Sequence, residues 1–179
     1  MAAKNVSNMQ KGNVTYKEVE ERSDRRLNII VRGIRESAKG DGLERKEDDR
    51  KLAISVCVST GAVEHNEMSE SILEIRRLGK YDEEKLYRPL LVKIGRGDLR
   101  EKLVRTGKKL RELNETNKTR YRIEADLTKE QTISYQAMWK EADAQSGNGK
   151  KFYVTGPREN PILRSRDLTE EEALATRDL

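Results

Sequence analysis

The sequence predicts an α+β fold in which strands and helices follow the order β-α-β-β-α-β, with a small α/β domain after them. Short β-branched segments alternate with longer segments of helical apolar spacing, and Gly, Pro or capping residues bound most of them. This order is that of the split-βαβ, ferredoxin-like unit. The 179 residues are enough for one domain of ordinary size or two small ones.

Four segments have the composition of strands and would form one sheet. The expected strands are Leu27–Ile34, Ser71–Leu78, Arg88–Ile94 and Tyr121–Leu127. Pro89 is compatible with the third because it lies at the start of that strand. Two shorter segments, Phe152–Thr155 and Ile162–Arg164, flank the turn signal Gly156-Pro157 and predict a hairpin.

The helices are indicated by their caps and by apolar spacing. Residues 44–60 are ambiguous, since their β-branched content favours a strand whereas the acidic approach and Gly61 favour a helix, and we predict a helix. Asp98 with Glu101, and Thr128 with Gln131, have the spacing of capping boxes. They predict helices over residues 98–113 and 128–145, with Asp98 and Thr128 as N-caps.

Alternation along the four strands assigns their side chains to two faces. The face covered by the helices would carry Leu27, Ile29, Val31, Leu73, Ile75, Leu90, Val92, Ile94, Tyr121 and Ile123. The open face would carry Asn28, Ile30, Arg32, Glu74, Arg76, Leu91, Lys93, Arg122 and Glu124. The open face is therefore expected to offer cations and aliphatic groups, with no aromatic ring.

Charge is segregated along the chain. Between Arg76 and Arg122 there are sixteen Lys or Arg and seven Asp or Glu, whereas the whole chain has a net charge of only +5. Such an excess on folded elements attracts phosphate-rich partners. Because the open face lacks rings for base stacking, we expect contacts mainly to phosphates, with mild sequence selectivity and strong salt dependence.

The predicted partner is RNA or single-stranded DNA, and the candidate binding residues come from this basic region, the first strand and the hairpin. They are Arg25, Arg26, Asn28, Arg32, Arg76, Arg77, Lys80, Arg88, Lys93, Arg96, Lys102, Arg105, Lys108, Lys109, Arg122, Lys151 and Tyr153.

The composition argues against several other classes of protein. One Cys and one His leave no intrachain disulfide and no Ser-His or Cys-His nucleophile, so we expect no enzymatic centre, metal or cofactor. Cys57, between two valines, is expected to be buried and inert. No apolar run approaches the roughly 20 residues of a membrane span. A nuclease built on Glu47, Asp48 and Asp49 is an alternative, but acids at a helix N-terminus explain these residues more simply.

Four segments in order carry a family resemblance. ERSDRRLNIIVRGIRE at 21–36 is followed by RRLGK at 76–80, RPLLVKI at 88–94 and IEADLT at 123–128, before a helix containing Trp139. This ordered set resembles the first-open-reading-frame proteins of LINE-type retrotransposons, over about residues 21–158. By position, Asn28 and Arg88 match the family's first-strand asparagine and the arginine that opens its third strand.

The resemblance implies an RNA-binding protein that coats its own transcript as a ribonucleoprotein and acts as a nucleic-acid chaperone, in the cytoplasm and also in the nucleus. It implies an RRM at 25–127, a C-terminal domain at 128–166 and a basic groove between them. Homotrimerisation through a preceding coiled coil is also implied, although residues 1–24 contain no sustained heptads. Ile30 stands where some members have a basic residue.

The ends of the chain are expected to be unpacked, because 39% of the residues are charged. This expectation applies to an N-terminal extension at 1–24, a helical remnant of a coiled coil, and to an acidic tail at 167–179. It extends to the Gly-containing stretches at 39–42 and 146–150.

The alternative function is a protein-interaction module whose basic face docks an acidic partner, such as the tail of another copy.

Overall fold

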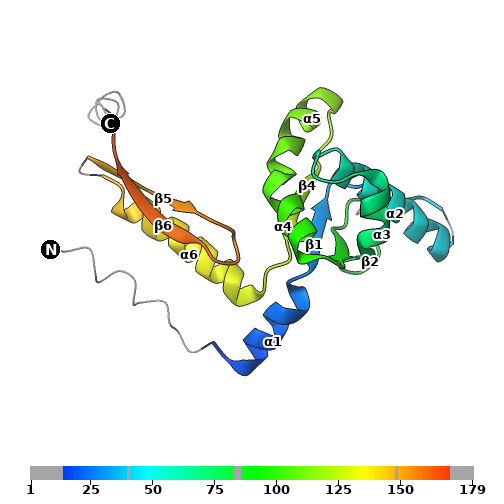
Figure 1. Ribbon diagram of the computed structural model, residues 1–179, viewed down its shortest axis with the longest axis horizontal. Helices are drawn as coiled ribbons and strands as arrows, with labels where there is room; N and C mark the ends of the chain where they lie inside the picture. The colour runs from blue at the N-terminus through cyan, green and yellow to red at the C-terminus, as the bar shows by residue number, and fades with distance from the viewer. Residues whose placement is uncertain (1–13, 40, 83–85, 148, 170–179) are drawn as a thin grey trace. The chain divides into compact units, whose positions relative to one another are not determined.

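A computed structural model describes residues 14–39, 41–82, 86–147 and 149–169, and its fold is α+β with antiparallel sheets (Figure 1). The chain divides into two compact units. The first comprises residues 23–126, and the second combines the residues up to 22 with those from 127 onward. This grouping joins the N-terminal helix to the C-terminal segment, whereas the sequence-based division set residues 1–24 apart.

The first unit contains a four-stranded sheet with the spatial order β2-β3-β1-β4. All neighbouring strands are antiparallel. The strands are β1 (Asn28–Arg32), β2 (Ile72–Arg77), β3 (Leu90–Ile94) and β4 (Arg122–Ala125). Each lies inside a segment that the sequence predicts to be a strand, although most of them are shorter at their ends.

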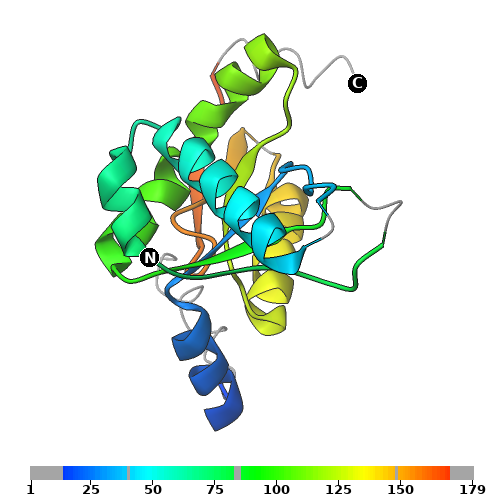
Figure 2. The ribbon, with the colours of Figure 1, turned by 90° about the vertical axis from the view of Figure 1, so that its right-hand side faces the viewer.

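Helices cover one face of this sheet. They are α2 (Gly42–Val58), α3 (His65–Ser71), α4 (Gly97–Thr106) and α5 (Leu110–Asn117), with the 3-10 turn η2 (Gly107–Lys109) between the last two. Apolar residues of α2, α4 and the strands form one buried cluster, and Figure 2 shows α2 in front of the strands. The helix predicted over residues 44–60 is confirmed, and Asp41 caps its start by accepting a hydrogen bond from Leu43 N at 3.0 Å.

Two details of the next helix differ from the prediction. Asp98 is not the N-cap, because the helix begins at Gly97 and Asp98 lies in its first turn. The helix also breaks at Gly107, which lies against the edge strand β4. A Cβ atom at this position would be 3.1 Å from the carbonyl oxygen of Ile123, so close packing against β4 favours glycine there.

Alternation is confirmed in β1, β3 and β4, where Ile29, Val92 and Ile123 are buried in the cluster. In β2 it fails at one position. The register shifts between Ile72 and Glu74, so that Ile72 is buried and Leu73 is 63% exposed. A β-bulge places two residues opposite one, and the assignment of Leu73 to the core is therefore wrong.

The second unit packs a hairpin along a helix. Helix α6 (Lys129–Gln145) is followed by β5 (Lys150–Thr155) and β6 (Ile162–Asp167), which are antiparallel and lie along α6 in Figure 1. The capping box is confirmed, because Thr128 Oγ1 accepts from Gln131 N at 3.1 Å and the Gln131 side chain accepts from Thr128 N at 3.0 Å.

Part of the chain that was expected to be unpacked is ordered. Helix α1 spans Tyr16–Arg25. Glu18 on this helix is buried, and its carboxylate accepts a hydrogen bond from Thr128 Oγ1 at 2.7 Å. Strand β6 continues to Asp167. The other parts of the expected unpacked stretches, residues 1–13, 40, 148 and 170–179, lie outside the described residues.

Cys57 is fully buried in α2, as the sequence predicts, and burial raises the pKa of its thiol to about 12. Since the thiolate is the reactive form, we expect no alkylation by iodoacetamide at about pH 8 in the native protein and rapid alkylation in urea. Mass spectrometry measures both rates. Equal rates in the native and unfolded protein would contradict this burial.

Candidate nucleic-acid interface

The open face of the four-stranded sheet brings basic side chains together in register. Arg32 of β1 lies directly opposite Arg122 of β4. The next row across the sheet is Arg76, Leu91, Ile30 and Glu124, and the row after it contains Glu74, Lys93 and Asn28. Partners across an antiparallel pair share a face, so all four predicted face cations lie on one surface.

Two of these four cations are paired with carboxylates of the same face. Arg32 Nε lies 2.9 Å from Glu124 Oε2, and Arg76 Nε lies 3.3 Å from Glu74 Oε1. Neither Lys93 nor Arg122 forms an ion pair with another described residue. The face thus carries two cations that form no ion pair with the described residues, although Lys93 lies opposite Glu74. The exposed ion pairs of the other two are worth only ~0–1 kcal/mol.

Aliphatic side chains occupy the middle of this face. Ile30 and Leu91 are Cα partners across β1 and β3, and both are buried although neither belongs to the helix-covered core. An ordinary RRM stacks bases on aromatic rings at the central strands. Here the same strands carry aliphatic side chains in place of rings, as the sequence predicts, and little of these side chains is exposed.

A third arginine lies beside the Arg32–Arg122 pair. Gly33 has φ +84°, and a Cβ atom there would be 2.3 Å from the carbonyl oxygen of Arg120. The backbone before β4 therefore packs directly on the end of β1, and the exposed Arg120 joins this corner of the sheet. Sequence reasoning missed Arg120 because it precedes the predicted strand. The one sign of this close approach in the sequence is the glycine at position 33.

The helical cations lie at the rim near β4, since Gly107 packs against Ile123 of that strand. Lys102, Arg105, Lys108 and Lys109 are all exposed, and none forms an ion pair within the described part of the chain. The same holds for the predicted residues Arg26 and Lys80. Exposed cations without counter-charges are the groups that contact phosphates at the least desolvation cost.

Arg77 belongs to the framework and not to the surface. Its guanidinium donates to both carboxylate oxygens of Asp49, at 3.0 and 2.5 Å, and to the carbonyl oxygens of Ile34 and Arg88 at 2.8 and 2.6 Å. Only 7% of its side chain is exposed. Each of its three nitrogen atoms donates to a protein acceptor, so its inclusion among the candidate binding residues is not supported by its position.

Arg88 is held in a similar way. It donates to both oxygens of Glu36 at 2.7 Å and to the carbonyl oxygen of Gly79 at 2.8 Å. These hydrogen bonds lower the pKa of Glu36. The residue that the family resemblance singled out therefore fixes the loop after β2 to the end of β1, in a strong bidentate pair.

The remaining predicted residues of the first unit also have protein partners. Asp126 accepts from Arg25 Nη1 at 3.0 Å and from Asn28 Nδ2 at 2.9 Å. Arg96 is exposed between Glu67, at 2.8 Å, and Asp98, at 2.5 Å. Its hydrogen bond lowers the pKa of Asp98. Arg25 and Asn28 thus position β1, while Arg96 remains at the surface.

The hairpin of the second unit repeats the pattern of the sheet. Lys151 lies directly opposite Arg166, and Tyr153 lies opposite Arg164, so these four side chains share one face. Lys151 and the two arginines are exposed, and Tyr153 is half-buried. Arg164 and Arg166 were missed by sequence reasoning. The strand was predicted to end at Arg164. A longer strand would have placed Arg164 and Arg166 on one face, because they are two positions apart.

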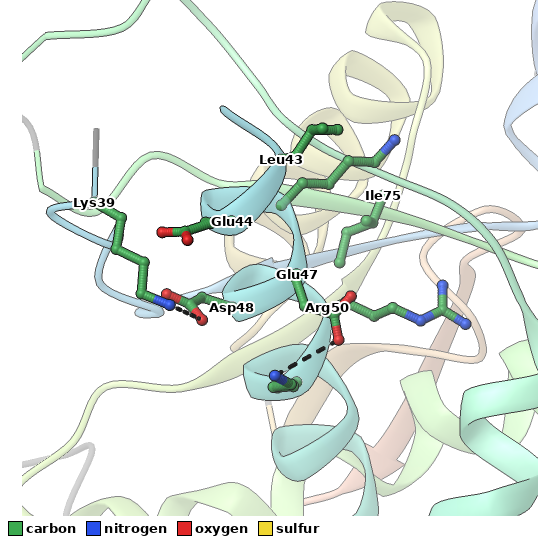
Figure 3. Close-up of a pocket in the computed structure, with 9 residues that line it drawn as sticks. Lys39, Leu43, Glu44, Glu47, Asp48, Arg50 and Ile75 are labelled. Atoms are coloured by element: carbon green, nitrogen blue, oxygen red, sulfur yellow. Dashed lines mark hydrogen bonds and ion pairs between the residues drawn. The ribbon is translucent and has the colours of Figure 1, made fainter. Parts of the chain in front are cut away.

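A hollow of about 610 Å³ lies beside α2 (Figure 3). Its charged side chains pair locally: Lys39 Nζ lies 3.0 Å from Asp48 Oδ1, and Lys51 Nζ lies 3.7 Å from Glu47 Oε1. Asp49 is committed to Arg77 instead. The three carboxylates of the nuclease alternative therefore do not converge on one site.

Among the residues that the structure describes, no helix combines the length and the apolar character needed to cross a membrane. Neither a protein-family model nor a curated protein matches the chain.

Proposed function

We propose that the protein binds RNA or single-stranded DNA through the phosphate backbone. The observation that carries this proposal is a pair of directly opposed cations on each of its two sheets, Arg32 with Arg122 and Lys151 with Arg166. Glu124 already pairs with Arg32, so Arg122 is the cation of the first pair that forms no ion pair with another described residue. A polyanion lying across each pair would gain attraction to these cations and to those around them.

We further propose that the first unit is an RRM-like domain. The order β2-β3-β1-β4, the antiparallel pairing and the helices on one face are what a β-α-β-β-α-β unit requires. Together with the ordered segments at 21–36, 76–80, 88–94 and 123–128, this arrangement supports a ribonucleoprotein component of a LINE-type element with nucleic-acid chaperone activity, and without an enzymatic centre.

The proposed mode of binding fixes the position of a nucleic-acid strand and has little selectivity for its bases. Arg32, Lys93 and Arg122 place charge around the aliphatic centre of the open face, which Ile30 and Leu91 form. Phosphate contacts fix the position of a strand without distinguishing its bases. We therefore expect oligo(U) and a mixed-sequence RNA of equal length to bind within a few-fold of each other.

A charge reversal at the pair tests this site. Arg122→Glu removes an exposed cation and is expected to weaken binding of fluorescein-labelled oligo(U) by about tenfold at low salt, as followed by fluorescence anisotropy. Lys151→Glu is expected to have a comparable effect through the hairpin. Lys46→Glu makes the same change in net charge on α2, at an exposed position outside both faces, and serves as the control.

The comparison separates a local site from a general charge effect. If Lys46→Glu weakens binding as much as Arg122→Glu and Lys151→Glu, the cation pairs do not form the interface.

Polyglutamate added as a competitor tests the alternative that the basic face binds an acidic protein. We expect it to displace oligo(U) only at a large excess, because flexible carboxylates cannot reproduce the spacing of a phosphate backbone.

A further inference from the structure

Three carboxylates of the second unit converge outside the candidate nucleic-acid interface. Glu18 and Glu21 are three positions apart in α1 and so lie on neighbouring turns of one helix face. Glu130 lies in the first turn of α6. One carboxylate oxygen from each of the three lies within 4.8 Å of the others.

The innermost of these carboxylates has an oxygen without a partner. Glu18 is 5% exposed, and its Oε1 accepts from Thr128 Oγ1 at 2.7 Å and from Arg22 Nε at 2.5 Å. Its Oε2 is buried and has no hydrogen-bond partner. Leaving a buried carboxylate oxygen unpaired is costly, so this atom indicates a ligand that the protein itself does not provide.

The protein supplies one counter-charge to this carboxylate, because Arg22 Nε contacts Oε1. The unpaired atom is the other oxygen, Oε2.

We propose that Glu18, Glu21 and Glu130 form a binding site for a hard divalent cation of the Ca²⁺ or Mn²⁺ type. Such ions prefer carboxylate oxygens, and water completes their coordination in sites with few protein ligands. The ion would join α1 to the start of α6 and supply the missing partner of Glu18 Oε2. Helix-dipole stabilisation explains an acid at Glu130, but it explains neither the burial of Glu18 nor its unpaired oxygen.

The site is tested on the full chain freed of nucleic acid, by titration with MnCl₂ and detection of the free ion by electron paramagnetic resonance. We expect saturable uptake that CaCl₂ displaces. Glu130→Gln keeps the shape of an exposed side chain and is expected to weaken uptake at least about tenfold, since it removes one charged ligand. Glu20→Gln, an exposed neighbour on α1, is the matched control and is expected to change nothing.

A second measurement guards against an effect on folding alone. Millimolar CaCl₂ should raise the Tm of the wild type and of Glu20→Gln but not of Glu130→Gln, because only a native site that binds the ion is stabilised by it. The proposal is overturned if the wild type takes up no more Mn²⁺ than Glu130→Gln, or if Glu20→Gln loses as much as Glu130→Gln. The result does not depend on whether the protein binds RNA.

Discussion

Replacement of Asp49 by Asn is expected to lower the free energy of unfolding of the first unit by about 3–5 kcal/mol. The side chain of Asp49 is 10% exposed and holds the guanidinium of Arg77 through two hydrogen bonds. An amide keeps the shape but removes the charge, and the guanidinium is then buried with carbonyl oxygens alone. Loss of one partner of a buried pair is costly because the other charge stays behind without compensation.

Cys57 provides the measurement, since its thiol is buried in the core of the same unit. Its alkylation rate as a function of urea concentration reports the opening of that unit, independently of the hairpin unit. Glu115→Ala is the control, because the Arg111–Glu115 pair is exposed at both ends and contributes only ~0–1 kcal/mol. Equal shifts of the urea midpoint in the two variants would contradict a structural role for the Arg77–Asp49 pair.

Gly33→Ala is expected to destabilise the same unit by about 3 kcal/mol. Two effects combine at this position. The φ of +84° is a conformation that L residues rarely adopt, and the new Cβ would lie 2.3 Å from the carbonyl oxygen of Arg120. That neighbour is backbone, so the approach of the segment before β4 to the end of β1 must change for alanine to fit.

Gly61→Ala separates the two effects. Gly61 also has a positive φ, of +68°, but a Cβ atom added there would meet no other atom within 4 Å. Only the conformational cost remains, and we expect a loss of about 1–2 kcal/mol. If the two variants have the same urea midpoint in the Cys57 assay, then the close approach of Gly33 to Arg120 does not contribute to stability.

The strands were predictable because their apolar residues recur with period two, and the exceptions have local causes. Leu73 lies at a bulge, where Ile72 is buried in its place, and no composition rule signals that position. Helix α3 has the sequence HNEMSES, in which Met68 is the only apolar residue, so no amphipathic period could indicate it. Gly107 was visible as a glycine, but the sequence did not indicate that it packs against β4.

The candidate site was predictable as a charge pattern but not residue by residue. Arg76 and Arg77 are adjacent, and alternation that places Arg76 on the open face also places Arg77 inside, where it needs a partner. Its partner Asp49 is 28 residues away, and the partner of Arg88 is 52 residues away. Charge counting cannot distinguish a cation that is committed to a distant carboxylate from one that is exposed.

Binding of fluorescein-labelled oligo(U) as a function of salt tests the central claim most directly. Neutralisation of about five phosphates predicts that affinity falls on the order of 100-fold between about 50 and about 200 mM salt. Arg122→Glu should reduce the slope of log affinity against log salt concentration by about one unit, and Lys46→Glu should leave the slope unchanged. A wild-type affinity that is independent of salt would contradict phosphate-backbone binding.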